Sequence, residues 1–304
     1  MERQLALPNQ DFTPLPAAVS ASRRTELVGL KPGWLVNALE RFSVRYKRDI
    51  HSVVLWTKDA TNIYEHRELR QELSKHNLLV EYTITGLGGT RIEPTVPESE
   101  VLLKRLPALL DFLGYPKRLR WRFDPIVTLR QENGDQWSSA IYFEELAKTM
   151  AYFGVDNCYF SFLQIYQDKF NRRSIKEAGI DILIPNHSQQ LEVLRDMRRI
   201  AEPLGIKLYS CTQPQLEGVE GITPAACIDT DLLTELHPQK LSVNPNQDKT
   251  MARLRPGCYC TQSIDIGTYL PCGHGCVYCY AEAAVPKPEK LIQKPMPWVP
   301  KIEL

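Results

Sequence analysis

The chain has 304 residues, of which 43% are hydrophobic and 24% charged, so it is long enough for one large domain or two modest ones with a substantial core. Its formal net charge of +1 excludes a general electrostatic attraction to polyanions, and nucleic acid would need a local basic face. No stretch approaches the roughly 18 consecutive apolar residues of a membrane helix, and no apolar run of signal-peptide length follows the charged start. We therefore expect a cytoplasmic protein without a membrane attachment.

Short β-branched or aromatic runs alternate with helical stretches along the chain, which is typical of repeated βα units and a parallel sheet. The predicted strands are 17–22, 52–57, 79–85, 118–124, 158–165, 207–211 and 263–270. Apolar repeats from Leu102 to Leu113 and from Leu191 to Leu204 predict amphipathic helices between them. About seven βα units predict an α/β fold, a TIM-like parallel barrel that is either full or partial.

The chain is expected to divide into three regions. Residues 1–245 form the barrel body, and residues 246–285 form a cysteine-rich segment that completes the barrel and binds a cluster. Residues 286–304 contain five prolines and are expected to be an extended tail.

Polar residues gather where the predicted strands end, as SRRTE (22–26), TKD (57–59), TGLGG (85–89) and RFDP (122–125). The carboxyl ends of parallel strands meet at one rim, so these groups should face one another around a site. Arg122 and Asp124 share one face of their strand, and Arg172 lies in a basic loop after the fifth strand. We interpret these three residues as substrate contacts, with a solvated surface as the alternative.

Three cysteines near the C-terminus, Cys272, Cys276 and Cys279, form a CxxxCxxC pattern. A loop with this spacing brings three thiolates onto one face of an ion or cluster and leaves one coordination position open. An iron–sulfur [4Fe-4S] cluster fits best, because structural zinc usually uses paired CxxC motifs and disulfides need an oxidising compartment. Zinc and unligated thiols are the alternatives. His274 is interpreted as a loop residue or hydrogen-bond donor rather than a ligand.

Four further cysteines, Cys211, Cys227, Cys258 and Cys260, are candidates for a second metal site. Four thiolates satisfy a closed iron–sulfur cluster, and two of these residues share a CxC turn. Zinc in the same four residues, or no closed site at all, are the alternatives. Cys158 lies inside an apolar run and is expected in the core.

The segment CGHGCVYCYA, at 272–281, resembles the cluster loop of radical S-adenosylmethionine enzymes, most closely those of the spore photoproduct lyase branch. The resemblance implies a [4Fe-4S] cluster whose open iron binds S-adenosylmethionine and cleaves it reductively to a 5′-deoxyadenosyl radical. It places Tyr278 near the adenine, and it implies a reductant such as flavodoxin or ferredoxin as a partner. It also makes a nucleobase or nucleic acid a candidate substrate, which the net charge does not support.

The order of the elements departs from that of these enzymes, whose cysteine loop follows the first strand of the barrel rather than the last. A closed barrel permits circular permutation, so strand 263–270 is expected to pair in parallel with strand 17–22. Ser22, Arg23 and Arg24 would then stand where the related enzymes bind the amino group of the methionine. Two arginines there would suit a carboxylate or phosphate, and plain surface arginines are the alternative.

A longer pattern resembles an uncharacterised bacterial family, domain of unknown function 1848. It runs from SASRRTE (20–26) through RWRFDP (120–125) and ACID (226–229) to SIDIGTY (263–269). Two other functions compete with a radical enzyme: an iron–sulfur redox or sensor protein, and a zinc-stabilised barrel that acts in binding.

Overall fold

The computed structural model describes residues 15–165, 175–268 and 271–279. Eight strands form a fully parallel sheet in the order β10-β9-β7-β4-β3-β2-β1-β11. They are β1 (Ala17–Ala21), β2 (Ile50–Thr57), β3 (Asn77–Thr83), β4 (Leu119–Ile126), β7 (Asn157–Phe162), β9 (Lys207–Ser210), β10 (Ile222–Pro224) and β11 (Ile264–Asp265). Seven of them correspond to the seven predicted strands.

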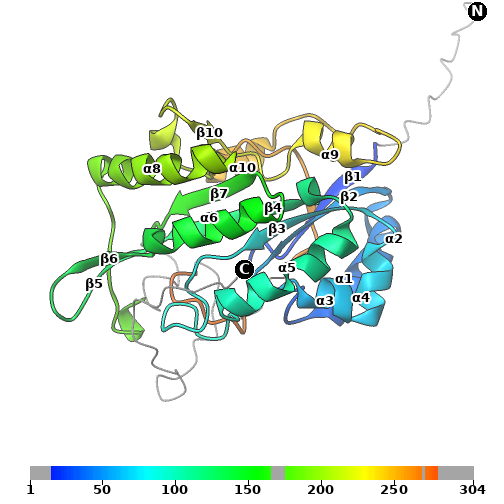
Figure 1. The fold of residues 1–304 in the computed structure, drawn as a ribbon. Helices are drawn as coiled ribbons and strands as arrows, with labels where there is room; N and C mark the ends of the chain where they lie inside the picture. The colour runs from blue at the N-terminus through cyan, green and yellow to red at the C-terminus, as the bar shows by residue number, and fades with distance from the viewer. Residues whose placement is uncertain (1–14, 166–174, 269–270, 280–304) are drawn as a thin grey trace, which may run out of the picture.

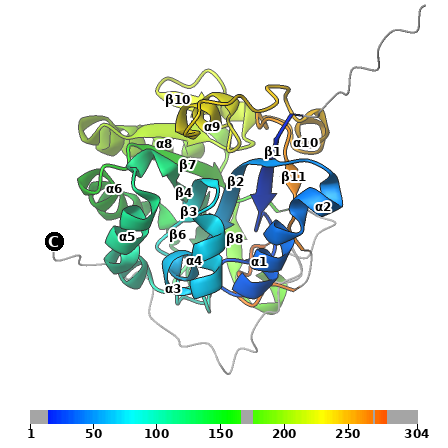
Figure 2. The same ribbon diagram turned by 90° about the vertical axis from the view of Figure 1, so that its right-hand side faces the viewer.

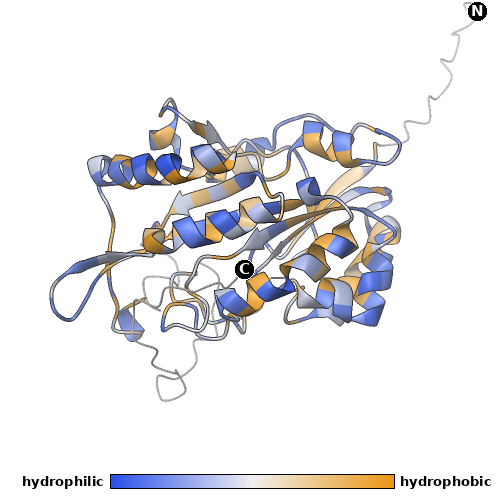
Figure 3. Cartoon of the chain, viewed as in Figure 1, coloured by the Kyte–Doolittle hydropathy of each residue, from blue (hydrophilic) through white to orange (hydrophobic). Residues whose placement is uncertain are grey.

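The helices of the βα units cover one face of this sheet (Figures 1 and 2). They are α1 (Pro32–Glu40), α2 (Phe42–Tyr46), α3 (Thr61–Glu65), α4 (Arg67–Leu73), α5 (Ser99–Leu113), α6 (Phe143–Tyr152) and α8 (His187–Ala201). Buried leucines of α5 pack with Val19, Val53 and Trp121 of the strands in one hydrophobic core. Figure 3 shows hydrophobic and hydrophilic residues side by side on these helices, as expected for elements with one buried face.

A second, smaller core covers the other face of the sheet. Ala18, Val54 and Leu79 alternate with residues of the first core, because successive strand residues point to opposite faces. They pack against Ile228 and against Leu233 of α9 (Thr230–Leu236), with α10 (Lys249–Leu254) nearby. The stretch between β10 and β11 therefore folds over this face of the sheet (Figure 2).

The remaining elements are short. An antiparallel sheet in the order β6-β5-β8 is formed by β5 (Thr128–Arg130), β6 (Gln136–Ser138) and β8 (Asp181–Leu183). Four 3-10 turns are η1 (Pro116–Arg118), η2 (Ser139–Tyr142), η3 (Glu202–Leu204) and η4 (Pro214–Leu216).

The predicted parallel α/β architecture is confirmed, but a barrel is not. Within the described residues β10 and β11 are the two outer strands, so the sheet is open. The expected pairing of the last strand with the first is present, with Val19 opposite Ile264 and Ser20 opposite Asp265. Strand β11 is shorter than predicted, and residues 269–270 lie outside the described part, as does the tail 286–304. Strand β4 also continues past Pro125, where the sequence suggested an end.

Candidate functional site

One cavity of about 270 Å³ opens at the carboxyl ends of the parallel strands, where ligands of α/β sheets usually bind. All eight strands of the main sheet contribute to its wall, either with their last residues or with the segment that follows. The lining includes Ser22, Arg23, Arg24, Trp56, Lys58, Thr83, Arg122, Asp124, Ser161 and all seven candidate ligand cysteines. Three of the four polar groups predicted at strand ends therefore contribute to the wall of one cavity.

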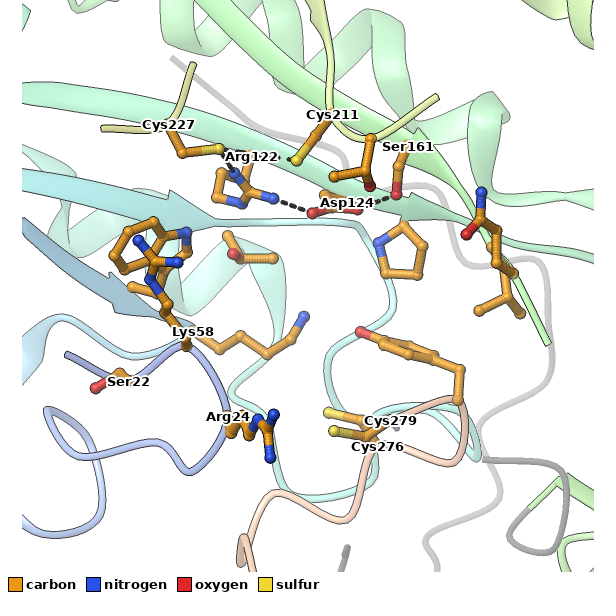
Figure 4. Close-up of a pocket in the computed structure, with 18 of the residues that line it drawn as sticks. Ser22, Arg24, Lys58, Arg122, Asp124, Ser161, Cys211, Cys227, Cys276 and Cys279 are labelled. Atoms are coloured by element: carbon orange, nitrogen blue, oxygen red, sulfur yellow. Dashed lines mark hydrogen bonds and ion pairs between the residues drawn. The ribbon is translucent and has the colours of Figure 1, made fainter. Parts of the chain in front are cut away.

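The two cysteine groups lie on opposite sides of this cavity (Figure 4). Cys276 and Cys279 approach from one side, and Cys211 and Cys227 approach from the other, with the Lys58 side chain between them. In the sequence, Cys211 and Cys227 precede Cys272 by about 60 and 45 positions, and the CxC pair lies closer to it. The fold therefore joins in one cavity two groups that the sequence presents as separate candidates.

The loop that carries Cys272, Cys276 and Cys279 is held by the turn that follows β3. The Val277 amide donates to the Ile92 carbonyl over 3.0 Å, and the Thr95 hydroxyl donates to the Gly273 carbonyl over 2.7 Å. Gly88 lets this turn fold back on itself, because a Cβ at that position would lie 2.1 Å from the Pro97 carbonyl oxygen. The glycines of the TGLGG motif therefore shape the support of the cysteine loop.

Glu93, in the same turn, is a buried acceptor shared by three side chains. Its carboxylate accepts a hydrogen bond from Lys58 Nζ over 2.9 Å, another from the Thr85 hydroxyl over 2.9 Å, and a third from the Tyr278 hydroxyl. Burial opposes the charge on Lys58, but the Glu93 carboxylate and the nearby Cys276 outweigh it and raise the pKa of the lysine. Burial also raises the pKa of the Cys276 thiol. Glu93 thus fixes both the cysteine loop and the cation beside it.

His274 is buried in the cysteine loop beside Glu26, with 3.6 Å between its Nε2 and the carboxylate. Glu26 itself accepts hydrogen bonds from the backbone amides of Gly29 and Lys58. Within the part of the chain that the structure describes, neither ring nitrogen of His274 has a hydrogen-bond partner. Buried polar atoms are usually satisfied, and His274 lines the cavity, so its ring nitrogens are available to a group bound there.

The opposite wall carries a buried network of ion pairs from β3 and β4. Glu81 lies 3.4 Å from Arg120 and 3.2 Å from Arg122, and Arg122 also pairs with Asp124, which accepts from the Ser161 hydroxyl. Burial, reinforced by Cys227 and opposed by the two arginines, raises the pKa of Glu81 to about 7. Buried charges are usually paired, as these are. The alternating charged residues of β4 therefore point into the protein and not into solvent.

Arg122 also contacts the second cysteine group, since its Nη1 donates to the Cys227 sulfur over 3.1 Å. The sulfurs of Cys227 and Cys211 are 3.8 Å apart. The Cys211 and Cys260 thiols, with help from Arg122, hold the pKa of Cys227 well below its usual range. Among these thiols, Cys227 is the one that lies within hydrogen-bond distance of a guanidinium.

Most of the other predicted site residues line the cavity. Ser22 follows β1 in a left-handed conformation, with φ of 67°, and its hydroxyl accepts from the Leu27 amide. Arg23 donates to the Ser263 hydroxyl over 3.2 Å and stacks on Trp56, and Arg24 lines the wall. Arg172 lies outside the described residues, whereas Cys158 is in the core, as expected.

Sequence reasoning missed Glu93, Glu81 and the role of Lys58. Glu81 carried a usable signal, because it is a charged residue inside an otherwise apolar run, NLLVEYT. Lys58 belonged to a polar group at a strand end but was not singled out. Glu93 had no such mark, since only the fold brings it to Tyr278, 185 positions further along the chain.

Neither cysteine group forms a closed site for a single metal ion. In the three described ranges, no three His, Cys, Asp or Glu side chains converge as a mononuclear ion requires. The thiolates that bind a polynuclear cluster need not converge on one point, because each of them binds a different iron. The donor set of three buried or half-buried thiols beside the half-buried Lys58 and the buried His274 suits such a group.

No helix in the described ranges is both long and apolar enough to cross a bilayer. A search of curated proteins finds no match to the chain. The family model for the domain of unknown function DUF1848 matches residues 18–281, which include every strand of the main sheet except the first residue of β1 and all of both cysteine groups. The chain therefore belongs to the DUF1848 family.

Proposed function

We propose that this protein is a radical S-adenosylmethionine-type enzyme that binds a [4Fe-4S] cluster through Cys272, Cys276 and Cys279. The observation that carries the proposal is the position of this CxxxCxxC loop at the carboxyl-end cavity, directly after the strand that pairs with β1. When bound, such a cluster supplies one-electron reduction of the sulfonium, which breaks its bond to the adenosyl carbon and yields methionine and a 5′-deoxyadenosyl radical.

The neighbouring strand supports a permuted arrangement of the usual fold. Because β11 pairs with β1, the turn with Ser22, Arg23 and Arg24 is next to the strand that leads into the cysteine loop. In our proposal this turn binds the methionine end of the cofactor, with an arginine on its carboxylate. Tyr278, held by Glu93, fixes the orientation of the loop.

The charges of the cavity favour an anionic substrate. Cationic side chains in its wall are Arg23, Arg24, Lys58, Arg122 and Arg255, whereas the anionic ones are Glu26 and Asp124. The volume of about 270 Å³ is near the lower end of the range of roughly 300–1,000 Å³ that ligand sites occupy, so the cavity suits a small molecule or one extruded base. Lys58 would stand beside the substrate, between the two cysteine groups.

Formation of 5′-deoxyadenosine tests this proposal. Protein reconstituted anaerobically with iron and sulfide, then given dithionite and S-adenosylmethionine, should form 5′-deoxyadenosine and methionine in equal amounts, measured by mass spectrometry. Cys158→Ala is the matched control, because Cys158 is a buried core thiol outside both groups. Reconstituted protein that holds iron and sulfide yet forms no 5′-deoxyadenosine would indicate a redox or sensor protein, and zinc in their place would indicate a binding protein.

A further inference from the structure

The second cysteine group is assembled from three separate segments of the chain. Cys211 directly follows β9, Cys227 lies after β10, and Cys258 and Cys260 lie shortly before β11. All four line the same cavity, on the side opposite the CxxxCxxC loop. Four thiols seldom meet in this way without a bridge or a metal, and all four are free in this structure.

Contacts among the thiols form a continuous group. The sulfurs of Cys211 and Cys227 are 3.8 Å apart, and Cys260 interacts with the thiols of both Cys227 and Cys258. Arg122 Nη1 lies 3.1 Å from the Cys227 sulfur, so a cation stands beside this chain of neighbouring thiols. A cation next to a cysteine favours its thiolate, which is the form that binds metals.

The backbone around these cysteines is fixed without any metal. Arg120 donates to the carbonyls of Ala226 and Cys227 over 2.7 and 2.9 Å. The Gln247 amide group donates to the Cys258 carbonyl over 2.9 Å, and the Asp248 backbone amide donates to the Cys260 carbonyl over 2.9 Å. A site whose main chain is held in this way is preorganised for its ligand.

We propose that Cys211, Cys227, Cys258 and Cys260 bind a second iron–sulfur cluster, which faces the first across the cavity. The four thiols line one side of the cavity from separate segments, and no three of them in the described residues converge on one point, as a single zinc ion would require. A cluster with one thiolate on each iron uses all four ligands and leaves no iron open, in contrast to the first group. Thr212, next to Cys211, is a β-branched residue with φ of 52°, a strained conformation that is typical of functional sites.

Arg122 is then a positioning residue for this cluster. Its Nη1 donates to the Cys227 sulfur over 3.1 Å, and Glu81 and Asp124 hold the guanidinium in place. Hydrogen bonds to ligand sulfurs help to set the reduction potential of a cluster. Arg122→Lys should therefore keep the iron but shift the potential of this cluster alone.

Iron and acid-labile sulfide in two complementary variants test the proposal. The variant in which Cys272, Cys276 and Cys279 are all changed to Ala should retain about half of the iron and sulfide of the unaltered protein, because one of two four-iron clusters remains. The variant with Cys258→Ala and Cys260→Ala should retain the other half. Cys158→Ala should keep the full amount.

Folding is verified separately, because lost iron could reflect a misfolded chain. Far-UV circular dichroism of each variant should match that of the unaltered protein, and the single variant Cys258→Ala replaces any double variant that fails this check. Iron near zero in a folded triple variant, or zinc in its place, overturns the second cluster. This proposal is independent of the first cluster. Loss of 5′-deoxyadenosine formation would count against the first cluster only, and loss of iron from the triple variant would count against the second only.

Discussion

The two cysteine groups of this protein differ in how the chain brings them together. Cys272, Cys276 and Cys279 lie within eight consecutive residues, whereas the other four cysteines come from segments after β9, after β10 and before β11. A local group can be read from its spacing, but an assembled group becomes visible only when the strands that carry it are placed. In our proposal the two groups also have different roles, since three thiolates leave one position of a cluster open for chemistry and four thiolates leave none.

The local group is nevertheless supported by distant residues. Glu93, Ile92 and Thr95 hold the loop from the turn after β3, nearly two hundred positions earlier in the chain. The spacing of the cysteines therefore indicates their chemistry, but their orientation depends on the fold. The predictions below test each half of this comparison.

The largest effect is expected from Cys276→Ala, which removes one ligand of the open group. Formation of 5′-deoxyadenosine should fall by at least about 100-fold, because even residues that only orient a metal ligand typically contribute 10- to 100-fold. Cys158→Ala should leave the rate within about twofold of the original, since its thiol lies in the core and does not line the cavity. Equal losses in the two variants would mean that folding, and not ligation, determines the rate.

Glu93→Gln tests the distant support of the loop. The change leaves Lys58 as a half-buried cation without its carboxylate, which should lower the free energy of unfolding by about 1.5–3 kcal/mol. Denaturant titration measures this loss. Glu100→Gln is the control, because Glu100 forms an exposed pair with Lys104 whose removal should cost no more than about 0.5 kcal/mol.

A second substitution separates the two contributions of Glu93. Adding Lys58→Met to Glu93→Gln removes the unpaired cation, so part of the lost stability should return. No recovery in the double variant would show that the hydrogen bonds to Thr85 and Tyr278, and not the ion pair, account for the stabilisation.

Gly88→Ala tests the same support through the backbone. The added Cβ would lie 2.1 Å from the Pro97 carbonyl oxygen, so the turn must shift, at a cost of about 1–3 kcal/mol in the free energy of unfolding. Iron bound by Cys211, Cys227, Cys258 and Cys260 should be unaffected. Gly33→Ala, where a Cβ meets nothing within 4 Å in helix α1, should change stability by less than about 1 kcal/mol and in the favourable direction.

The smallest effect is expected from Asn186→Ala, remote from both groups. Asn186 caps α8 by accepting from the Gln189 amide, and its loss should cost about 1 kcal/mol of stability. Ser188→Ala in the same first turn should be neutral within about 0.5 kcal/mol. Neither variant should alter the iron content, and a loss of iron in Asn186→Ala would show that the sites depend on overall stability.

Much of the fold is visible in the sequence, because buried parallel strands appear as short, nearly continuous apolar runs. Strand β10 escaped prediction because it has three residues, one of them Pro224. The open sheet also differs from the predicted barrel, since the sequence specifies the strands but not whether the outer two meet.

Only part of the candidate site can likewise be predicted from the sequence. The cysteine spacing and the alternation of Arg122 and Asp124 indicate a site, because both patterns are local. The roles of Glu93 and Lys58 arise from contacts between segments that are distant in sequence, so no local pattern predicts them. Local sequence patterns therefore predict more of the fold than of the site.

The most direct test of the open and closed assignments is electron paramagnetic resonance of the reduced protein with and without S-adenosylmethionine. Our account predicts that the cofactor changes the cluster signal of the unaltered protein and of Cys258→Ala, but not the signal that remains when Cys272, Cys276 and Cys279 are replaced by Ala. A cofactor-dependent change that persists in that triple variant, or that disappears in Cys258→Ala alone, would contradict the assignment of the open cluster to the CxxxCxxC loop.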